Sequence, residues 1–226
     1  MKKSIALAAL VAVSSLFIIG CSKDDTEAPI ITLLGSNPLQ LEMLDTYSEP
    51  GATADDNEDG DISSSINVDA TEIENRLPAS YNVYYSVSDA AGNPADAIRE
   101  VVVYATNNAL AKSYNVVDCV FTTSGVFVPP AFSYTQTLTA SGSDVNTYSL
   151  FANYNQPTPT NYVVTSTING NGTITMGSQT VTVSNGDSHT FSGTGVVTLN
   201  GFRIDYTDVN NTVSGTAEGK AYYTRQ

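Results

Sequence analysis

The chain has 226 residues, with 23 acidic side chains, nine basic side chains, no tryptophan and a formal net charge of −14 at pH 7. Nucleic-acid binding needs a basic surface that meets the phosphates, so this balance excludes nucleic acid as a partner.

The chain opens with the layout of a secretory signal peptide. Two lysines precede an apolar run, residues 5–20, which contains two adjacent serines and ends on Gly20. A membrane-spanning helix needs about 20 apolar residues, and this run is shorter. We therefore predict that residues 1–20 are a signal peptide that is removed from the mature protein.

The residue after Gly20 is a cysteine, and Ile18-Ile19-Gly20-Cys21 resembles the lipobox of bacterial lipoproteins. The resemblance implies that Cys21 carries acyl chains, palmitate among them, and that they hold the protein in the outer membrane. Each buried methylene contributes about 0.8 kcal/mol, and stable anchoring takes two chains. The alternative is an ordinary signal peptide followed by an incidental cysteine.

Residues 21–27 are then a lipidated tether. Within it, Ser22-Lys23-Asp24-Asp25 resembles the signal that carries some lipoproteins across the outer membrane. The resemblance implies exposure at the cell surface, with the periplasmic face as the alternative.

Charge divides the rest of the chain in two. Residues 24–104 hold 17 acidic side chains and two arginines, a balance of −15, whereas residues 105–226 hold six acidic and four basic side chains, a balance of −2. Removal of residues 1–20 leaves 206 residues (226 minus 20), enough for two domains. We predict one domain over residues 28–105 and another over residues 107–226.

The first domain is predicted to be all-β. In residues 81–88, apolar side chains alternate with more polar ones, which is the pattern of a half-buried strand. A turn follows at Gly92 and Asn93, which tolerate positive φ, and residues 98–104 form the returning strand of a hairpin.

Four motifs in this domain resemble, in order, the bacterial surface immunoglobulin-like (Ig-like) domain. They are Glu49-Pro50-Gly51-Ala52-Thr53-Ala54-Asp55, Asp59-Gly60-Asp61-Ile62, Ser80-Tyr81-Asn82-Val83 and Val87-Ser88-Asp89-Ala90-Ala91-Gly92-Asn93. The resemblance covers about residues 28–105 and implies a β-sandwich of about seven strands. It also implies a role as a spacer or a binding module, because fold alone assigns no function.

One acidic loop has the pattern that begins a calcium-binding loop. Asp55, Asn57, Asp59 and Asp61 place oxygen ligands at alternate positions, and a glycine precedes the last of them. The twelfth position is Ile66, so the bidentate glutamate of an EF-hand is missing. We predict weak calcium binding by these four residues; the alternative is a solvated acidic turn. No other cofactor is predicted.

The second domain is predicted to be an antiparallel meander of about eight strands. Turn signals separate the strand-like runs, at residues 169–172, at Gly177-Ser178, at Asn185-Gly186 and at Asn200-Gly201. The meander fits an up-and-down barrel that resembles a lipocalin-like fold, or a sandwich. A barrel interior could hold one small ligand.

Most aromatic side chains of this domain are expected in its core, because the chain has no tryptophan. Two irregular stretches, residues 123–134 and 148–162, contain the candidate ligand-binding aromatics Phe127 and Tyr154. Loops stiffened by proline that expose aromatic rings suit ligand capture.

No catalytic motif appears, so we predict that the protein is not an enzyme. The single histidine, His189, follows a turn signal and is expected at a solvated strand end. Cys119 lies in a β-prone run and is expected to be a small buried apolar residue, not a nucleophile.

The sequence therefore predicts a cell-surface lipoprotein whose second domain captures an extracellular ligand, and a glycan is the expected class of ligand. The alternative is a structural spacer or adhesin that presents a β domain at the surface.

Overall fold

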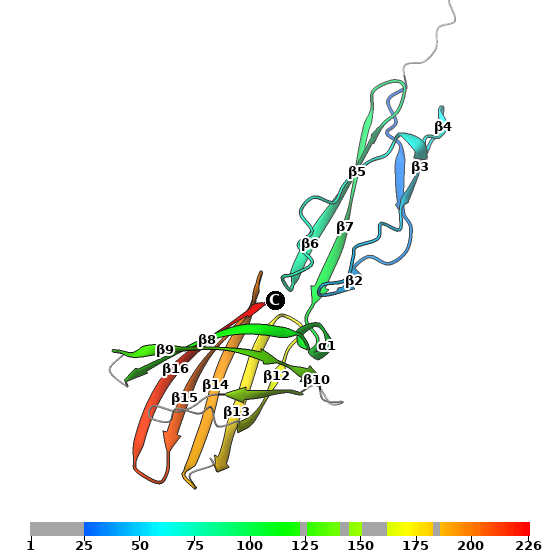
Figure 1. Cartoon of the computed structure of the whole chain (residues 1–226). Helices are drawn as coiled ribbons and strands as arrows, with labels where there is room; N and C mark the ends of the chain where they lie inside the picture. Colours follow the sequence, from blue (N-terminus) through cyan, green and yellow to red (C-terminus); the bar gives the residue numbers. More distant parts are fainter. Residues whose placement is uncertain (1–24, 123–125, 141–144, 151–161, 183–185) are drawn as a thin grey trace, which may run out of the picture.

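A computed structural model describes residues 25–122, 126–140, 145–150, 162–182 and 186–226. It has two β domains arranged end to end (Figure 1). No helix among these residues is long and apolar enough to cross a membrane.

The first domain is a sandwich of seven strands in two sheets, as predicted. One sheet has the order β1-β3-β4, from strands β1 (Ile30–Leu33), β3 (Ala52–Asp56) and β4 (Gly60–Asp61). The other has the order β2-β7-β6-β5, from β2 (Leu39–Glu42), β7 (Pro94–Tyr104), β6 (Ala79–Ser88) and β5 (Asn67–Asp69). A short 3₁₀ helix, η1 (Ser63–Ser65), precedes β5.

The alternation of buried and exposed side chains along β6 shows which residues of the central hairpin form the core of the sandwich. Val83, Tyr85 and Val87 of β6 are buried, and the residues between them are more exposed. Ser88 pairs with Pro94, which closes the β6–β7 hairpin at the predicted turn. Gly92 has a φ of 94°, a conformation that glycine adopts at low cost.

A buried arginine joins the two sheets. Arg99 of β7 is 0% exposed, and its guanidinium donates to the carbonyl oxygens of Leu34, Ser36 and Gly51. Its Nε donates to the Tyr85 hydroxyl at 2.9 Å, and Glu49 Oε1 lies 3.6 Å from its Nη2. The guanidinium therefore supplies donors to these three backbone acceptors, of which Gly51 O also accepts from Leu34 N.

The second domain is an antiparallel meander that closes into a barrel, one of the two predicted alternatives. Its strands, in chain order, are β8 (Ser113–Thr122), β9 (Phe127–Thr137), β10 (Thr139–Ala140), β11 (Val145–Leu150), β12 (Tyr162–Ile168), β13 (Thr173–Thr182), β14 (Ser188–Thr198), β15 (Gly201–Asn210) and β16 (Gly215–Arg225). Strand β16 returns to pair with β8. Strands β9 and β10 follow one another with a single residue between them. Strand β9 pairs with β8 and β10 pairs with β11, so together they complete the ring.

One predicted turn is wrong. Gly177 and Ser178 lie inside β13, where the pairing with β14 shifts register between Met176 and Gln179. The two residues form a bulge that bends the strand, because one extra position can be absorbed without ending the ladder. The turn at residues 169–172 and the turn between β14 and β15 are where they were predicted.

The two domains meet around a short helix, α1 (Asn107–Leu110). Thr106 caps it by accepting a hydrogen bond from Ala109 N, and the Thr106 hydroxyl also donates to Glu42. The amide of Ala105 donates to Gly170 O of the barrel at 2.9 Å. One continuous cluster of buried apolar side chains includes Met43 of the sandwich and Leu110 at the junction, and it extends into the barrel.

Candidate functional site

Aromatic rings fill the barrel interior at the end next to α1. Tyr114, Phe202 and Tyr223 are each at most 2% exposed. The Phe202 and Tyr223 rings stack at 4.2 Å, and Tyr114 meets Phe202 edge-on at 5.1 Å. The Tyr114 hydroxyl donates to Leu110 O, which ties this cluster to α1. The sequence analysis allowed a ligand cavity inside the barrel, but side chains fill this part of the interior.

Further along, the interior holds a buried carboxyl. Asp118 of β8 is 0% exposed, and the Tyr206 hydroxyl donates to its two oxygens at 2.9 and 3.0 Å. Burial raises the pKa of Asp118 to about 7, although the hydrogen bond from Tyr206 opposes the shift. The Tyr206 ring lies against Gly219, where a Cβ atom would be 2.0 Å from Tyr206 Cζ. Only glycine leaves room for this ring.

His189 is not at a solvated strand end, as the sequence predicted. It is 8% exposed, and its Nδ1 lies 2.8 Å from Asp208 Oδ1 on the neighbouring strand. Burial raises the pKa of Asp208, while the hydrogen bond and the charge of His189 oppose that shift. The antiparallel register of β14 and β15 places the two side chains together, which a single strand cannot show.

Cys119 is a free thiol on the other face of β8 from Asp118. Burial raises the pKa of Cys119, and the charge of Asp118 raises it further. Both effects disfavour the thiolate, so the residue lacks the activation that a nucleophile needs.

A hollow of about 570 Å³ opens on the outer face of β14, β15 and β16. Its polar lining residues alternate along these strands with inward-facing ones; they are Ser192, Thr194, Asp205, Thr207, Glu218 and Lys220. Phe121 of β8 borders the hollow, and Lys220 Nζ lies 5.8 Å from the centre of its ring. Met176, Gly193, Tyr206 and Gly219 complete the lining.

One carboxylate in this hollow is held in place by a neighbouring arginine. Arg203 binds Asp205 Oδ2, at 2.8 Å from Nη2 and 3.1 Å from Nε. Asp205 Oδ1 is buried and accepts no hydrogen bond from the residues that the structure describes. The hollow therefore combines two carboxylates, hydroxyl groups, an ammonium group and an aromatic ring.

Of the two aromatic residues predicted to bind a ligand, Phe127 lies on the strand beside a lining residue of this hollow. Phe127 is the register partner of Phe121 across β8 and β9. Tyr154 lies outside the described residues. The sequence did not predict this hollow, because its lining comes from five strands and no short motif contains it.

The predicted calcium loop connects β3 to β4, at the end of the sandwich farthest from the barrel (Figure 1). Asp55 and Asp61 are exposed register partners, and Asp61 accepts hydrogen bonds from Ser63. Asp59 Oδ2 accepts from Ala90 N at 2.6 Å, and Asn57 is exposed in the turn.

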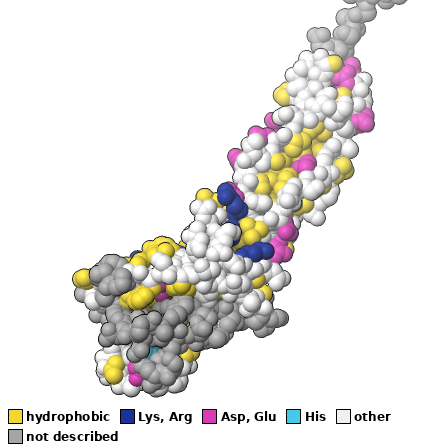
Figure 2. All heavy atoms as spheres, in the orientation of Figure 1, with side chains coloured by type: hydrophobic (Ala, Val, Ile, Leu, Met, Phe, Trp, Pro, Cys, Tyr) yellow, Lys and Arg dark blue, Asp and Glu magenta, His cyan; other side chains and the backbone are white. Residues whose placement is uncertain are grey.

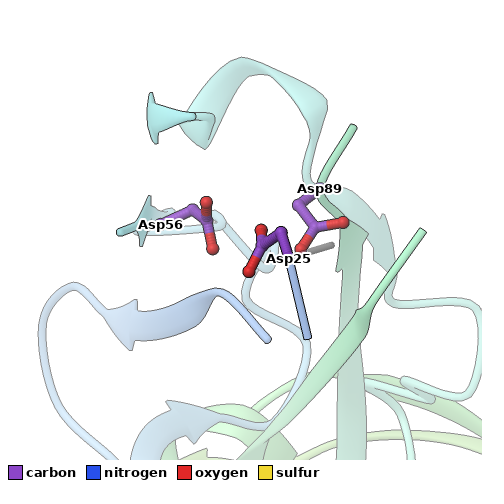
Figure 3. Close-up of side chains that lie close together, drawn as sticks. All are labelled: Asp25, Asp56 and Asp89. Atoms are coloured by element: carbon purple, nitrogen blue, oxygen red, sulfur yellow. The ribbon is translucent and has the colours of Figure 1, made fainter. Parts of the chain in front are cut away.

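The carboxylates of Asp55, Asp59 and Asp61, which the sequence predicts as calcium ligands, do not come close enough together to share a metal ion. Among the described residues, the acidic side chains that come close enough to share a metal ion are Asp25, Asp56 and Asp89, with one oxygen of each within 4.8 Å of the others (Figure 3). In an extended strand, neighbouring side chains point to opposite faces, so the buried carboxylate is Asp56 and not Asp55.

Acidic side chains are prominent over the sandwich on the face that Figure 2 shows. This matches the excess of acidic residues in residues 24–104. Several of these side chains accept hydrogen bonds from residues close in the sequence, as Asp69 does from Thr71 N and the Thr71 hydroxyl.

Three comparisons with known proteins bear on the fold. The model of one family, described as bacterial surface protein, Ig-like domain, matches residues 31–103. The search of curated proteins found no match.

Among solved structures, the lipoprotein BT2262 from Bacteroides thetaiotaomicron is similar at 19% identity and a TM-score of 0.36, over 88% of this chain and 100% of that one. The CBM51-2 and INT domains of Clostridium perfringens ZmpB, in complex with GlcNAc, are similar at 14% identity and a TM-score of 0.29, over 87% of this chain and 44% of that one. The same domains in a second structure show 13% identity and a TM-score of 0.28, over 85% and 47%.

Similarities at these TM-scores carry no argument about function, whereas the family match agrees with the strands observed. The matched residues run from β1 to the end of β7, and they include the four motifs noted in the sequence. The sandwich formed by β1 to β7 is therefore a bacterial surface Ig-like domain.

Proposed function

We propose that this protein is a non-enzymatic binding protein of the cell surface, and that the outer face of its barrel captures an oligosaccharide. The observation that carries the proposal is the hollow over β14, β15 and β16, with its mixed polar and aromatic lining. The family to which the sandwich belongs is described as a bacterial surface domain, which supports the location.

The chemistry of the hollow suits a sugar. A sugar ring has hydroxyl groups at its edge and apolar C–H groups on its faces. Glu218 offers acceptors to the hydroxyls, Lys220 offers a donor, and Phe121 offers an apolar surface. A concave site with a few fixed polar groups is the usual form of a small-ligand site.

Substitution of Phe121 should test this site. We expect Phe121→Ala to lower the affinity for an oligosaccharide, first identified on a glycan array with the purified chain, by tenfold or more, about 1.4 kcal/mol. Tyr222→Ala is the matched control, because Tyr222 is 42% exposed on β16 but does not line the hollow. We expect Phe127→Ala and Tyr154→Ala to weaken the same binding.

Three results would contradict the proposal. The first is an array with no ligand, the second is equal loss of affinity in Phe121→Ala and Tyr222→Ala, and the third is hydrolysis of the bound oligosaccharide. The third would indicate a glycosidase, which needs two carboxyl groups that flank the bond.

The filled end of the barrel interior favours a second candidate, a spacer or adhesin. A packed core gives a stiff body, and the end-to-end arrangement of the domains gives length (Figure 1). This candidate replaces the first if the array finds no ligand and the protein instead supports adhesion of cells that display it.

The anchor is the remaining part of the proposal, and Cys21 lies outside the described residues. We expect Cys21→Ala to shift the protein from the membrane fraction to the soluble fraction, because the acyl chains would be lost. Mass spectrometry of the mature amino terminus is the direct measurement. An unmodified Cys21 in the parent protein would refute lipidation.

A further inference from the structure

The far end of the Ig-like domain brings together three carboxylates from distant parts of the chain. Asp25 precedes β1, Asp56 ends β3 and Asp89 follows β6. One oxygen of each lies within 4.8 Å of the others, and Figure 3 shows the three side chains converging. None of the ion pairs formed by the described residues involves them, so their mutual repulsion has no cationic side chain beside it.

One of these carboxylates is buried with an unused oxygen. Asp56 is 5% exposed, and its Oδ2 is buried with no hydrogen-bond partner. Its Oδ1 accepts from Glu58 N at 3.0 Å and from Asp59 N at 2.9 Å, which fixes the side chain. A buried, unpaired carboxylate oxygen is costly, and a coordinated cation is one of the few partners that offsets the cost.

The second carboxylate is held equally firmly. Asp89 is 8% exposed, and its Oδ1 accepts from Gly92 N and Asn93 N at 2.7 and 2.8 Å. Burial opposes its charge, but the hydrogen bonds from Asn93 and Gly92 outweigh burial and lower the pKa of Asp89, which keeps it ionised. The bond from Ala90 N to Asp59 ties its turn to the β3–β4 loop, so the two ligands are placed before any ion binds.

The third carboxylate comes from the segment before β1. Asp25 is half-buried; its backbone carbonyl accepts from Asn93 Nδ2 at 3.3 Å, and its Oδ1 accepts from Glu27 N at 3.1 Å. The hydrogen bonds that hold Asp25 are longer than those that hold the carboxylates of Asp56 and Asp89. A cation shared by all three would bind this segment to the end of the domain.

We propose that Asp25, Asp56 and Asp89 bind a calcium ion, which clamps the segment before β1 onto the Ig-like domain. Carboxylate oxygens suit hard cations. Calcium accepts irregular sets of six to eight oxygens, so water and backbone carbonyls can complete its shell, whereas magnesium demands a near-ideal octahedron. The clamp would fix how the domain is held by the residues that precede it.

Calcium titration of the purified full chain tests the site. Isothermal titration with calcium chloride should show one site, with a Kd in the range of extracellular modules, about 10⁻⁴ to 10⁻³ M. Saturating calcium should raise the melting temperature by about 3–5 °C. Magnesium at the same concentration should produce a smaller shift.

Variants separate this site from the loop that the sequence predicted. Asp56→Asn, Asp89→Asn and Asp25→Ala should each raise the Kd by at least tenfold and reduce the thermal shift. Asp55→Asn is the matched control, because Asp55 is the exposed neighbour of Asp56 on the same strand; its Kd should stay within twofold. Asp25→Ala keeps the test decisive if either buried variant fails to fold.

Two results would overturn the proposal. One is the absence of calcium binding by the parent chain up to 10 mM, about ten times the weak end of the expected range. The other is loss of binding in Asp55→Asn with retention in Asp25→Ala, which would place the ion in the β3–β4 loop. Neither result depends on whether the barrel binds an oligosaccharide.

Discussion

Replacement of Arg99 by methionine should lower the free energy of unfolding by about 3–5 kcal/mol, because it removes the charged partner of a buried network. The methylene stem would still pack, but the carbonyl oxygens of Leu34 and Ser36 would lose their donor inside the sandwich, while Gly51 O would keep its bond from Leu34 N. Each unsatisfied buried acceptor costs about 1–3 kcal/mol. Urea unfolding of the full chain, followed by circular dichroism, measures the change.

Arg76→Met is the control for this experiment. Arg76 forms an ion pair with Glu74 at 2.8 Å, but its side chain is 49% exposed. An exposed pair contributes at most about 1 kcal/mol, so this substitution should change the stability little. If Arg99→Met and Arg76→Met are equally mild, Arg99 does not join the two sheets energetically.

The second large effect is expected at Asp118, where Asp118→Asn should stabilise the protein at pH 8 by about 2–4 kcal/mol. Burial raises the pKa of Asp118 to about 7, from 3.8 for an exposed aspartate. A difference of about three units corresponds to about 4 kcal/mol, which is the cost of holding the ionised form in the barrel. Asparagine carries no charge and can still accept the hydrogen bond from Tyr206.

The pH dependence has a definite sign. Between about pH 4 and pH 7 the folded protein keeps a proton on Asp118 that the unfolded chain has lost. Stability from this group is therefore greatest in acid, falls as the pH rises through that window, and is level above it. The advantage of Asp118→Asn should shrink towards zero near pH 4.

Chemical unfolding at pH 4, 6 and 8 measures this profile. Glu218→Gln is the control, because Glu218 is exposed on β16 and its neutralisation should change the stability by less than about 0.5 kcal/mol. An Asp118→Asn variant that is less stable than its parent at pH 8 would show that the ionised carboxylate is favourable in the barrel.

Local patterns in the sequence determined much of the architecture. The alternation in residues 81–88 and the turn at Gly92 gave the β6–β7 hairpin, because side-chain direction and turn conformation are set within a few residues. The short turns of the second half implied antiparallel neighbours, and the strand order confirms them. The bulge at Gly177 was mistaken for a turn, because a glycine permits both and only the partner strand selects one.

The sites depend on contacts between residues far apart in the sequence. The sequence predicts calcium ligands that include Asp55, and only the structure shows that the neighbouring Asp56 turns inward and lies close to Asp25 and Asp89. The sequence also predicts that His189 is exposed to solvent, whereas the register of β14 and β15 buries it against Asp208.

The sequence by itself determined the strands and turns of the two halves and the place where the acidic charge gathers, because each follows from spacing along the chain. The resemblance of four motifs to a known family added the Ig-like domain. Only the tertiary structure decided that the meander closes as a barrel and that its hollow lies on the outer face. It also decided which carboxylates converge. The physical reason is that strand pairing and burial depend on which distant segments pack together, and the amino-acid pattern of one segment does not contain its partner.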